Sequence, residues 1–176
     1  MFDKTFEAKE LLDKMKHTTM CLFETLPEPY KKALDILKKA APDVKGFEAM
    51  ALPDFVATYG MEDWDLSLPA LRRFTQYYSS ELAIRPFLDK DPVKGMAYMT
   101  EWADDKKPKV RRLASEGCRP RLPWAMALPK FKKDPKPILP ILEKLKDDAS
   151  EDVRRSVANN LNDISKDNPE LALEIC

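Results

Sequence analysis

The sequence predicts an all-α fold in which pairs of helices repeat along the chain as a solenoid. The 176 residues include only four glycines but fifteen prolines, a balance that suits short helices better than a sheet with tight hairpins. One segment recurs at an offset of 43 residues, and residues typical of helix starts recur at a similar interval. With 44% hydrophobic and 34% charged residues, we expect a single globular domain over residues 1–176.

The repeat relates residues 104–117, DDKKPKVRRLASEG, to residues 147–160, DDASEDVRRSVANN. The offset places Val110 on Val153 and one arginine pair on the other. A period of 43 residues lies in the range of two-helix solenoid repeats. We therefore expect a right-handed superhelix of HEAT-like repeats, with the second helix of each repeat on the concave face.

Helices are expected along the whole chain. In the first half they are expected over residues 5–23, 28–40, 47–59, 67–78 and 80–90, with Pro86 kinking or shortening the last. In the second half, the first helices of the two repeats are expected over 92–104 and 135–147, and the second helices over 108–119 and 150–165.

N-cap residues followed by proline mark the helix starts in the second half. They are Asp91-Pro92, Asp134-Pro135 and Asn168-Pro169. Ser150 is expected to cap the helix over 150–165, with two acids in its first turn, where they favour the helix dipole.

The helix over 108–119 has one apolar face. Val110, Leu113, Ala114 and Gly117 follow the spacing of a buried stripe. Arg112 and Glu116 lie one turn apart beside it, and the simplest interpretation is an ion pair worth a few tenths of a kcal/mol.

The other conspicuous polar and aromatic residues also have structural interpretations. Glu81 follows two serines, as a first-turn acid beside an N-cap would, and Asp163 fits a solvated helix position. Trp124 could fill the gap between repeats, and Trp64 and Trp102 are expected in the core.

Positive charge is concentrated in one segment of a chain with zero net charge. Residues 106–136 contain eleven Lys or Arg and two acids, an excess of nine positive charges. All nine arginines lie from Arg72 onward. A basic surface for a polyanion and an ordinary solvated face are both compatible with this pattern.

The sequence contains few residues suited to a membrane span, a disulfide framework or a metal site. It contains no apolar run of about 18 residues and no apolar signal segment at its start, so we expect no membrane span and a cytoplasmic location. Cys21, Cys118 and Cys176 are expected as reduced thiols. Because His17 is the only histidine, we expect neither a metal site nor a cofactor.

Four strings, taken together, resemble one family. They are GFEAMALPDFVATYG (46–60), FTQYYSSELAIRPFL (74–88), VRRLASEGCRPRLPWA (110–125) and LKDDASEDVRRSVANNLNDISKDNPELALE (145–174). They resemble the HEAT-like-repeat DNA alkylation repair glycosylases, and within them the AlkC branch. The resemblance implies hydrolysis of the N-glycosidic bond of N3-methyladenine and similar cationic purines in double-stranded DNA, by water and without metal or cofactor.

The resemblance also assigns roles to residues. Glu116 and Asp163 would flank the sugar of the lesion as catalytic residues, and Glu81 would support or share that catalytic role. Trp124 would contact the lesion nucleotide. Arg112, Arg119, Arg121 and Arg155 would hold the flanking phosphates. Acids within a basic groove oppose the binding of a polyanion, so a catalytic task would explain their presence there.

Members of the family continue beyond the LNDISKD segment, whereas this chain ends at Cys176, within the first helix of a further repeat. We therefore expect a shortened form that lacks the C-terminal repeats, a monomer whose uncapped end could self-associate. The alternative function is a non-catalytic HEAT-repeat scaffold that binds nucleic acid or a protein along its groove.

Overall fold

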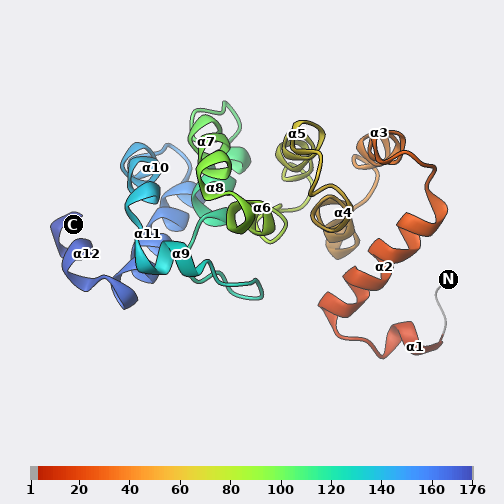
Figure 1. The fold of residues 1–176 in the computed structure, drawn as a ribbon, viewed down its shortest axis with the longest axis horizontal. Coiled ribbons are helices and arrows are strands. Elements are labelled where there is room, and N and C mark those ends of the chain that lie inside the picture. Colours follow the sequence, from red (N-terminus) through yellow and green to blue (C-terminus); the bar gives the residue numbers. More distant parts are fainter. Residues whose placement is uncertain (1–3, 176) are drawn as a thin grey trace. The chain divides into compact units, whose positions relative to one another are not determined.

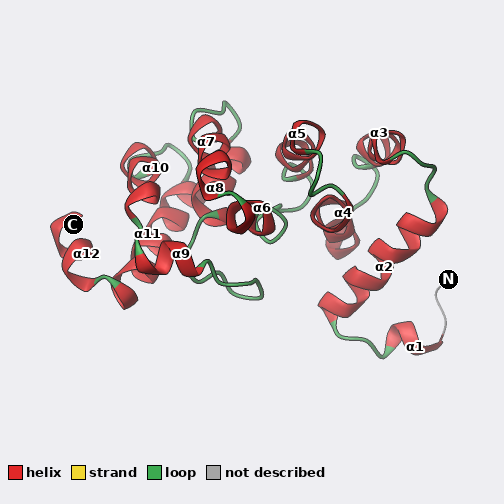
Figure 2. Cartoon of the chain, in the orientation of Figure 1, coloured by secondary structure: helices red, strands yellow, loops and turns green. Residues whose placement is uncertain are grey.

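A computed structural model describes residues 4–175, and every regular element in that range is a helix (Figures 1 and 2). The prediction of an all-α protein is confirmed. Within the same range no helix combines the length and hydropathy needed to cross a bilayer. The helices group into two compact units, Met1–Ala83 and Ile84–Cys176. That the chain forms one continuous domain stays a prediction.

Six helical elements lie in residues 4–83, the described part of the first unit. They are α1 (Lys4–Glu7), α2 (Leu11–Thr25), α3 (Tyr30–Ala40), the 3-10 helix η1 (Gly46–Met50), α4 (Ala51–Tyr59) and α5 (Trp64–Phe74). α4 packs against α2 and α5, and Phe55, Leu68 and Phe74 are buried in this core. The predicted helix over 5–23 is wrong, because α1 and α2 are separate helices.

Eight helical elements lie in residues 84–175, the described part of the second unit. They are α6 (Arg85–Lys90), α7 (Pro92–Trp102), α8 (Pro108–Gly117), α9 (Pro129–Lys133), the 3-10 helix η2 (Lys136–Ile138), α10 (Leu139–Leu145), α11 (Glu151–Asp167) and α12 (Pro169–Ile175). α8 packs against both α7 and α11, and α10 packs against α8 and α11. The two predicted helix pairs, α7 with α8 and α10 with α11, are thus neighbours in space (Figure 1).

Prolines and caps set several boundaries differently from the prediction. Pro86 lies in the first turn of α6, so the helix predicted over 80–90 is shortened to Arg85–Lys90, as one of the two predicted effects of this proline, and is not kinked by it. α5 begins at Trp64, earlier than predicted, because the carboxylate of Asp63 accepts a hydrogen bond from the N–H of Leu66. The short helix α9 was not predicted.

Caps in the second half agree in part. The carboxylate of Asp91 accepts from the N–H of Lys94 at 3.0 Å, which confirms that cap. Asp134 accepts from the N–H of Lys136 at 3.2 Å, but the helix there starts as 3-10 and becomes α-helical only at Leu139. Ser150 is the N-cap residue of α11, as predicted, but its side chain makes no capping hydrogen bond.

The repeated sequence has repeated geometry. The carboxylates of Asp105 and Asp148 each accept from the N–H two residues later, at 2.8 Å in both cases. Arg111 and Arg154 each donate to the carbonyl of the preceding aspartate of their own repeat, at 2.9 and 2.5 Å. Arg111 also makes a bidentate contact with Asp148, which joins one repeat to the next.

The predicted buried positions are confirmed. Val110, Leu113 and Ala114 are at most 1% exposed, and Gly117 is buried with them. Trp64 and Trp102 lie in the cores of their units. Within the described residues Cys21 and Cys118 are buried and form no disulfide, in agreement with their prediction as reduced thiols, whereas Cys176 lies outside the described residues.

Candidate active site

The packing of α8 against α11 brings two predicted catalytic acids to one arginine. Glu116, in the last turn of α8, is 4% exposed, and Asp163 of α11 is 1% exposed. Arg119, just past the end of α8, donates from Nη1 to Glu116 Oε1 at 2.7 Å and from Nε to Asp163 Oδ2 at 2.8 Å. One guanidinium therefore holds both carboxylates.

The second oxygen of each acid also has a partner. The Ser156 hydroxyl donates to Glu116 Oε2 at 2.6 Å and lies 3.0 Å from the Ser115 hydroxyl. Lys166 Nζ lies 3.3 Å from Asp163 Oδ1. Both acids are thus fixed in orientation by groups from α8, α11 and the residues that follow α8.

The predicted ion pair between Arg112 and Glu116 exists but is long. Arg112 Nη2 lies 3.7 Å from Glu116 Oε1, whereas the Arg119 contact with the same oxygen is 1.0 Å shorter. The two acids face three cations, Arg112, Arg119 and Lys166. The cluster as a whole therefore carries one excess positive charge, which is compatible with an approaching phosphate chain.

The electrostatics of Arg119 favour its charged form. Burial lowers its pKa, but hydrogen bonds to Asp163 and Glu116 outweigh that effect and raise the pKa above its ordinary value. Burial raises the pKa of the neighbouring Cys118 to about 12. A thiol with that pKa is a poor nucleophile at neutral pH, so the carboxylates are the stronger candidates for chemistry.

Trp124 lies on an exposed loop between α8 and α9. Its side chain is 69% exposed, so the interpretation that it fills a gap between repeats is wrong. Its backbone has a φ of 64°, in the left-handed region that bulky residues rarely adopt. Leu122 and Leu128 on either side are buried and anchor the loop, which leaves the indole pointing out of the core.

Two of the arginines predicted to bind phosphate lie on the surface. Arg121 donates to both oxygens of Asp167, at 2.9 and 2.6 Å. Arg155 donates to Glu151 at 2.6 Å, and its side chain is 62% exposed. Exposed ion pairs of this kind are weak, so a phosphate could replace the carboxylate partner.

Glu81 belongs to the other unit. It lies in the segment between α5 and α6, where the Ser79 hydroxyl donates to its Oε2 at 2.6 Å. That Glu81 joins Glu116 and Asp163 in one site stays a prediction.

Sequence reasoning missed three polar residues around the acids. Ser156 and Asn160 lie among buried apolar residues of α11, where Asn160 donates to the carbonyl of Ser115 at 2.8 Å. Arg85 is fully buried at the start of α6. The sequence signal for each of them is a polar residue at a position within an apolar stripe. Such a residue requires a buried hydrogen-bond partner.

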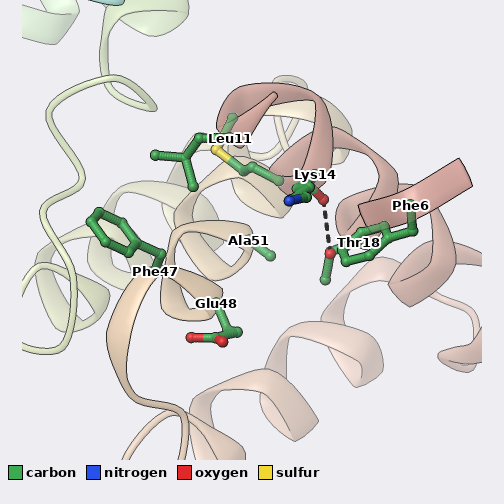
Figure 3. Close-up of a pocket in the computed structure, with 8 residues that line it drawn as sticks. Phe6, Leu11, Lys14, Thr18, Phe47, Glu48 and Ala51 are labelled. Atoms are coloured by element: carbon green, nitrogen blue, oxygen red, sulfur yellow. Dashed lines mark hydrogen bonds between the residues drawn. The ribbon is translucent and has the colours of Figure 1, made fainter. Parts of the chain in front are cut away.

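Cavities of a different kind, including two lined mainly by apolar and aromatic residues, lie among the described residues of the first unit. One, of about 190 Å³, is lined by Phe6, Leu11, Lys14, Met15, Thr18, Phe47, Glu48 and Ala51 (Figure 3). Its lining is mainly apolar, and the Thr18 hydroxyl donates to the carbonyl of Lys14 at 2.9 Å instead of pointing to a ligand. The other, of about 300 Å³, is lined mainly by aromatic residues of α2, α3 and α4 and by the prolines between α2 and α3.

In residues 4–175 no three His, Cys, Asp or Glu side chains are grouped so that they could hold a metal ion. The acid cluster offers a different chemistry. Two fixed carboxylates can stabilise positive charge that develops in a transition state, or they can orient a water molecule.

The chain is similar in sequence to known proteins. Residues 138–167, from the end of η2 through α11, match the HEAT repeat family. The protein named Uncharacterized protein YhaZ of Bacillus subtilis (strain 168) is 52% identical over 165 residues, which is 94% of this chain and 46% of that protein.

A solved structure extends the likeness to the fold. The Pseudomonas fluorescens alkylpurine DNA glycosylase AlkC, bound to DNA containing an abasic site analog, matches with a TM-score of 0.93 and 42% identity. The match covers 96% of this chain and 47% of that one. This chain is similar to AlkC in sequence and in fold. The predicted resemblance to the AlkC branch and the predicted HEAT-like solenoid class are confirmed, and the AlkC-like chain spans about half the length of both relatives.

Proposed function

We propose that the AlkC-like chain is part of a DNA repair glycosylase that hydrolyses the N-glycosidic bond of cationic alkylated purines such as N3-methyladenine. One observation carries the proposal. Glu116 and Asp163 are buried on adjacent helices and joined through Arg119, in a chain 42% identical to an alkylpurine DNA glycosylase. The activity belongs to the whole protein, of which this chain supplies the acid cluster.

The chemistry suits carboxylates that do not act as general acids. An alkylated purine with a positive charge leaves without being protonated, so the barrier lies mainly in the sugar cation that forms. Carboxylates beside the deoxyribose stabilise that cation or position the water that attacks it. Arg119 and Ser156 hold Glu116 in place for this task, and Arg119 and Lys166 hold Asp163.

DNA would be held through its backbone. Arg112, Arg121 and Arg155 are partly or largely exposed and are assigned to the phosphates, which gives salt-dependent binding without sequence preference. Arg119 is 8% exposed and its guanidinium is occupied by two acids, so we assign it to positioning those acids in place of a phosphate. The exposed indole of Trp124 would contact the lesion nucleotide.

A base-release assay tests the proposal. Duplex DNA treated with a methylating agent is incubated with the full-length protein, and free N3-methyladenine is quantified by mass spectrometry. We expect release by the wild type and a reduction of about 10²- to 10³-fold in Glu116→Gln and in Asp163→Asn, since each removes one electrostatic contact with the cation.

The matched control is Glu143→Gln. Glu143 is an exposed glutamate of α10, paired with Lys146 at 2.7 Å, so its loss should leave release unchanged. An unchanged rate in Asp163→Asn would remove that residue from the mechanism.

A second candidate is a HEAT-repeat scaffold that binds nucleic acid without catalysis. It is favoured by the observation that every oxygen of Glu116 and Asp163 already has a protein partner. This candidate predicts salt-dependent DNA binding, no base release, and binding that is indifferent to the amide substitutions.

A further inference from the structure

Arg85 is a fully buried arginine whose hydrogen-bond acceptors are backbone carbonyls. From Nη1 it donates to the carbonyls of Gly117 and Arg119, at 3.0 and 2.8 Å, and from Nε to the carbonyl of Met126 at 2.6 Å. Within the described residues its Nη2 has no hydrogen-bond partner. Because a buried guanidinium with an unpaired nitrogen is unfavourable, stability alone does not explain this residue.

The three carbonyls lie on both sides of the loop that carries Trp124. Gly117 and Arg119 lie at the end of α8, where helix carbonyls lack partners and the helix dipole favours a cation. Met126 lies on the far side of the loop, two residues after Trp124. Arg85 therefore joins the helix of Glu116 to the segment that presents the indole.

The contact between Ile84 and Gly117 explains how Arg85 reaches this position. A Cβ added at Gly117 would lie 2.6 Å from Ile84 Cγ2, so only glycine allows the start of α6 to approach the end of α8 this closely. The side chain of the next residue, Arg85, then extends across the end of α8.

The backbone of Trp124 needs such a support. Its φ of 64° is strained for a bulky residue, and such conformations persist only where the surroundings impose them. The buried side chains of Leu122 and Leu128 impose part of it, and the bond between Leu128 N and Pro120 O, at 3.1 Å, closes the loop. The bond from Arg85 to Met126 holds the segment immediately after the indole.

We propose that Arg85 is a positioning residue for base excision, which holds the loop so that the Trp124 indole stands in a fixed place relative to Glu116. The inference rests on the proposed function for the step it serves. The claim that Arg85 holds the loop in place does not depend on the proposed function, because the position of the loop can be measured in the protein without DNA.

The first test needs no DNA. The full-length protein is labelled with 5-fluorotryptophan, and the fluorine signals are assigned by single Trp→Phe variants. In Arg85→Lys, which keeps the charge but loses the planar set of donors, we expect the Trp124 signal to shift and broaden. The signal of buried Trp102, in the same unit, should stay unchanged and so report an intact core.

Arg111→Lys is the matched control. Arg111 lies toward the opposite end of α8, where it bonds Asp148 and the carbonyl of Asp105. Its replacement therefore also removes a guanidinium that makes several hydrogen bonds to other segments. It should leave the Trp124 signal in place. If Arg85→Lys does not fold, Gly117→Ala serves as the second variant, since it displaces the same contact and should shift the same signal.

The second test measures single-turnover release of N3-methyladenine in a double-mutant cycle. Arg85→Lys should lower the rate roughly 10- to 100-fold, because small displacements of positioning groups have effects of this size. In the Trp124→Ala background the further loss should be under about threefold, since both changes act through one loop.

The outcomes separate the two proposals. An unshifted Trp124 signal in Arg85→Lys, or the same fold-loss in both backgrounds, overturns the role of Arg85. A wild-type protein that releases no base contradicts the proposed function, while the fluorine signals still decide whether Arg85 holds the loop.

Discussion

Removal of the Arg119 guanidinium should be far more damaging than removal of the Arg112 guanidinium, although both contact Glu116. The substitutions are Arg119→Met and Arg112→Met, which keep most of the side-chain volume and remove the charge. Arg119 bonds two carboxylates whose side chains are 6% and 2% exposed, at 2.7 and 2.8 Å. Arg112 is 3.7 Å from one of them and its own side chain is 32% exposed.

The expected magnitudes follow from these contacts. Without Arg119, Glu116 Oε1 retains Arg112 at 3.7 Å and Asp163 retains Lys166 at 3.3 Å. Loss of one partner of a buried ion pair costs about 3–5 kcal/mol, because the other charge stays buried. For Arg112→Met we expect about 0–1 kcal/mol, as for a half-exposed pair.

Equilibrium urea unfolding, followed by circular dichroism, measures both effects. Adding Asp163→Asn to Arg119→Met should recover part of the lost free energy of unfolding, because one uncompensated buried charge is removed. Equal costs for the two arginines, or a cost under about 1 kcal/mol for Arg119→Met, would refute the view that Arg119 holds the acid cluster together.

Three further predictions concern the frame around the site. Arg111 lowers the pKa of Asp148 below its ordinary value of 3.8 through their hydrogen bonds. The pair therefore stabilises the fold fully above pH 3.8, and it stabilises it less as the pH falls through the folded-state pKa of Asp148. The difference in unfolding free energy between wild type and Arg111→Met should be about 1–2 kcal/mol at pH 7 and should shrink below pH 3.8. Gly117→Ala should lower the unfolding free energy by about 1–3 kcal/mol despite the higher helix propensity of alanine, because its Cβ would clash with Ile84; a thermal melt at or above the wild-type temperature would contradict this. Trp124→Gly should change the unfolding free energy by less than about 1 kcal/mol, because relief of the left-handed backbone strain offsets the greater chain entropy of glycine in the unfolded state. The same substitution should weaken binding to DNA that contains an abasic-site analogue, which fluorescence anisotropy measures.

The sequence predicted the repeat and the buried face of α8 because both depend on local periodicity. Val110 and Val153 occupy equivalent buried positions, and the two arginines that follow them bond equivalent carbonyls. Such features follow from helical spacing, which can be recognised within a single segment of sequence.

Features that depend on contacts between distant segments were not predictable in this way. Arg119 reaches Asp163 over 44 positions of sequence, and Arg85 reaches Met126 over 41. On helical spacing alone, Arg112 was the expected partner of Glu116, but the turn after α8 brings Arg119 closer. Whether Trp124 fills a gap between repeats or is exposed stayed open at the level of sequence, because the left-handed backbone of this residue has no sequence signal in a non-glycine residue.

The most direct measurement is the release of N3-methyladenine from methylated duplex DNA by the full-length wild type and by the double variant Glu116→Gln/Asp163→Asn. The acid cluster around Arg119 predicts release well above the spontaneous rate for the wild type, and release near the spontaneous rate for the double variant with DNA binding retained. A folded wild type that binds DNA without releasing the base, or a double variant as active as the wild type, would contradict a catalytic role for these carboxylates.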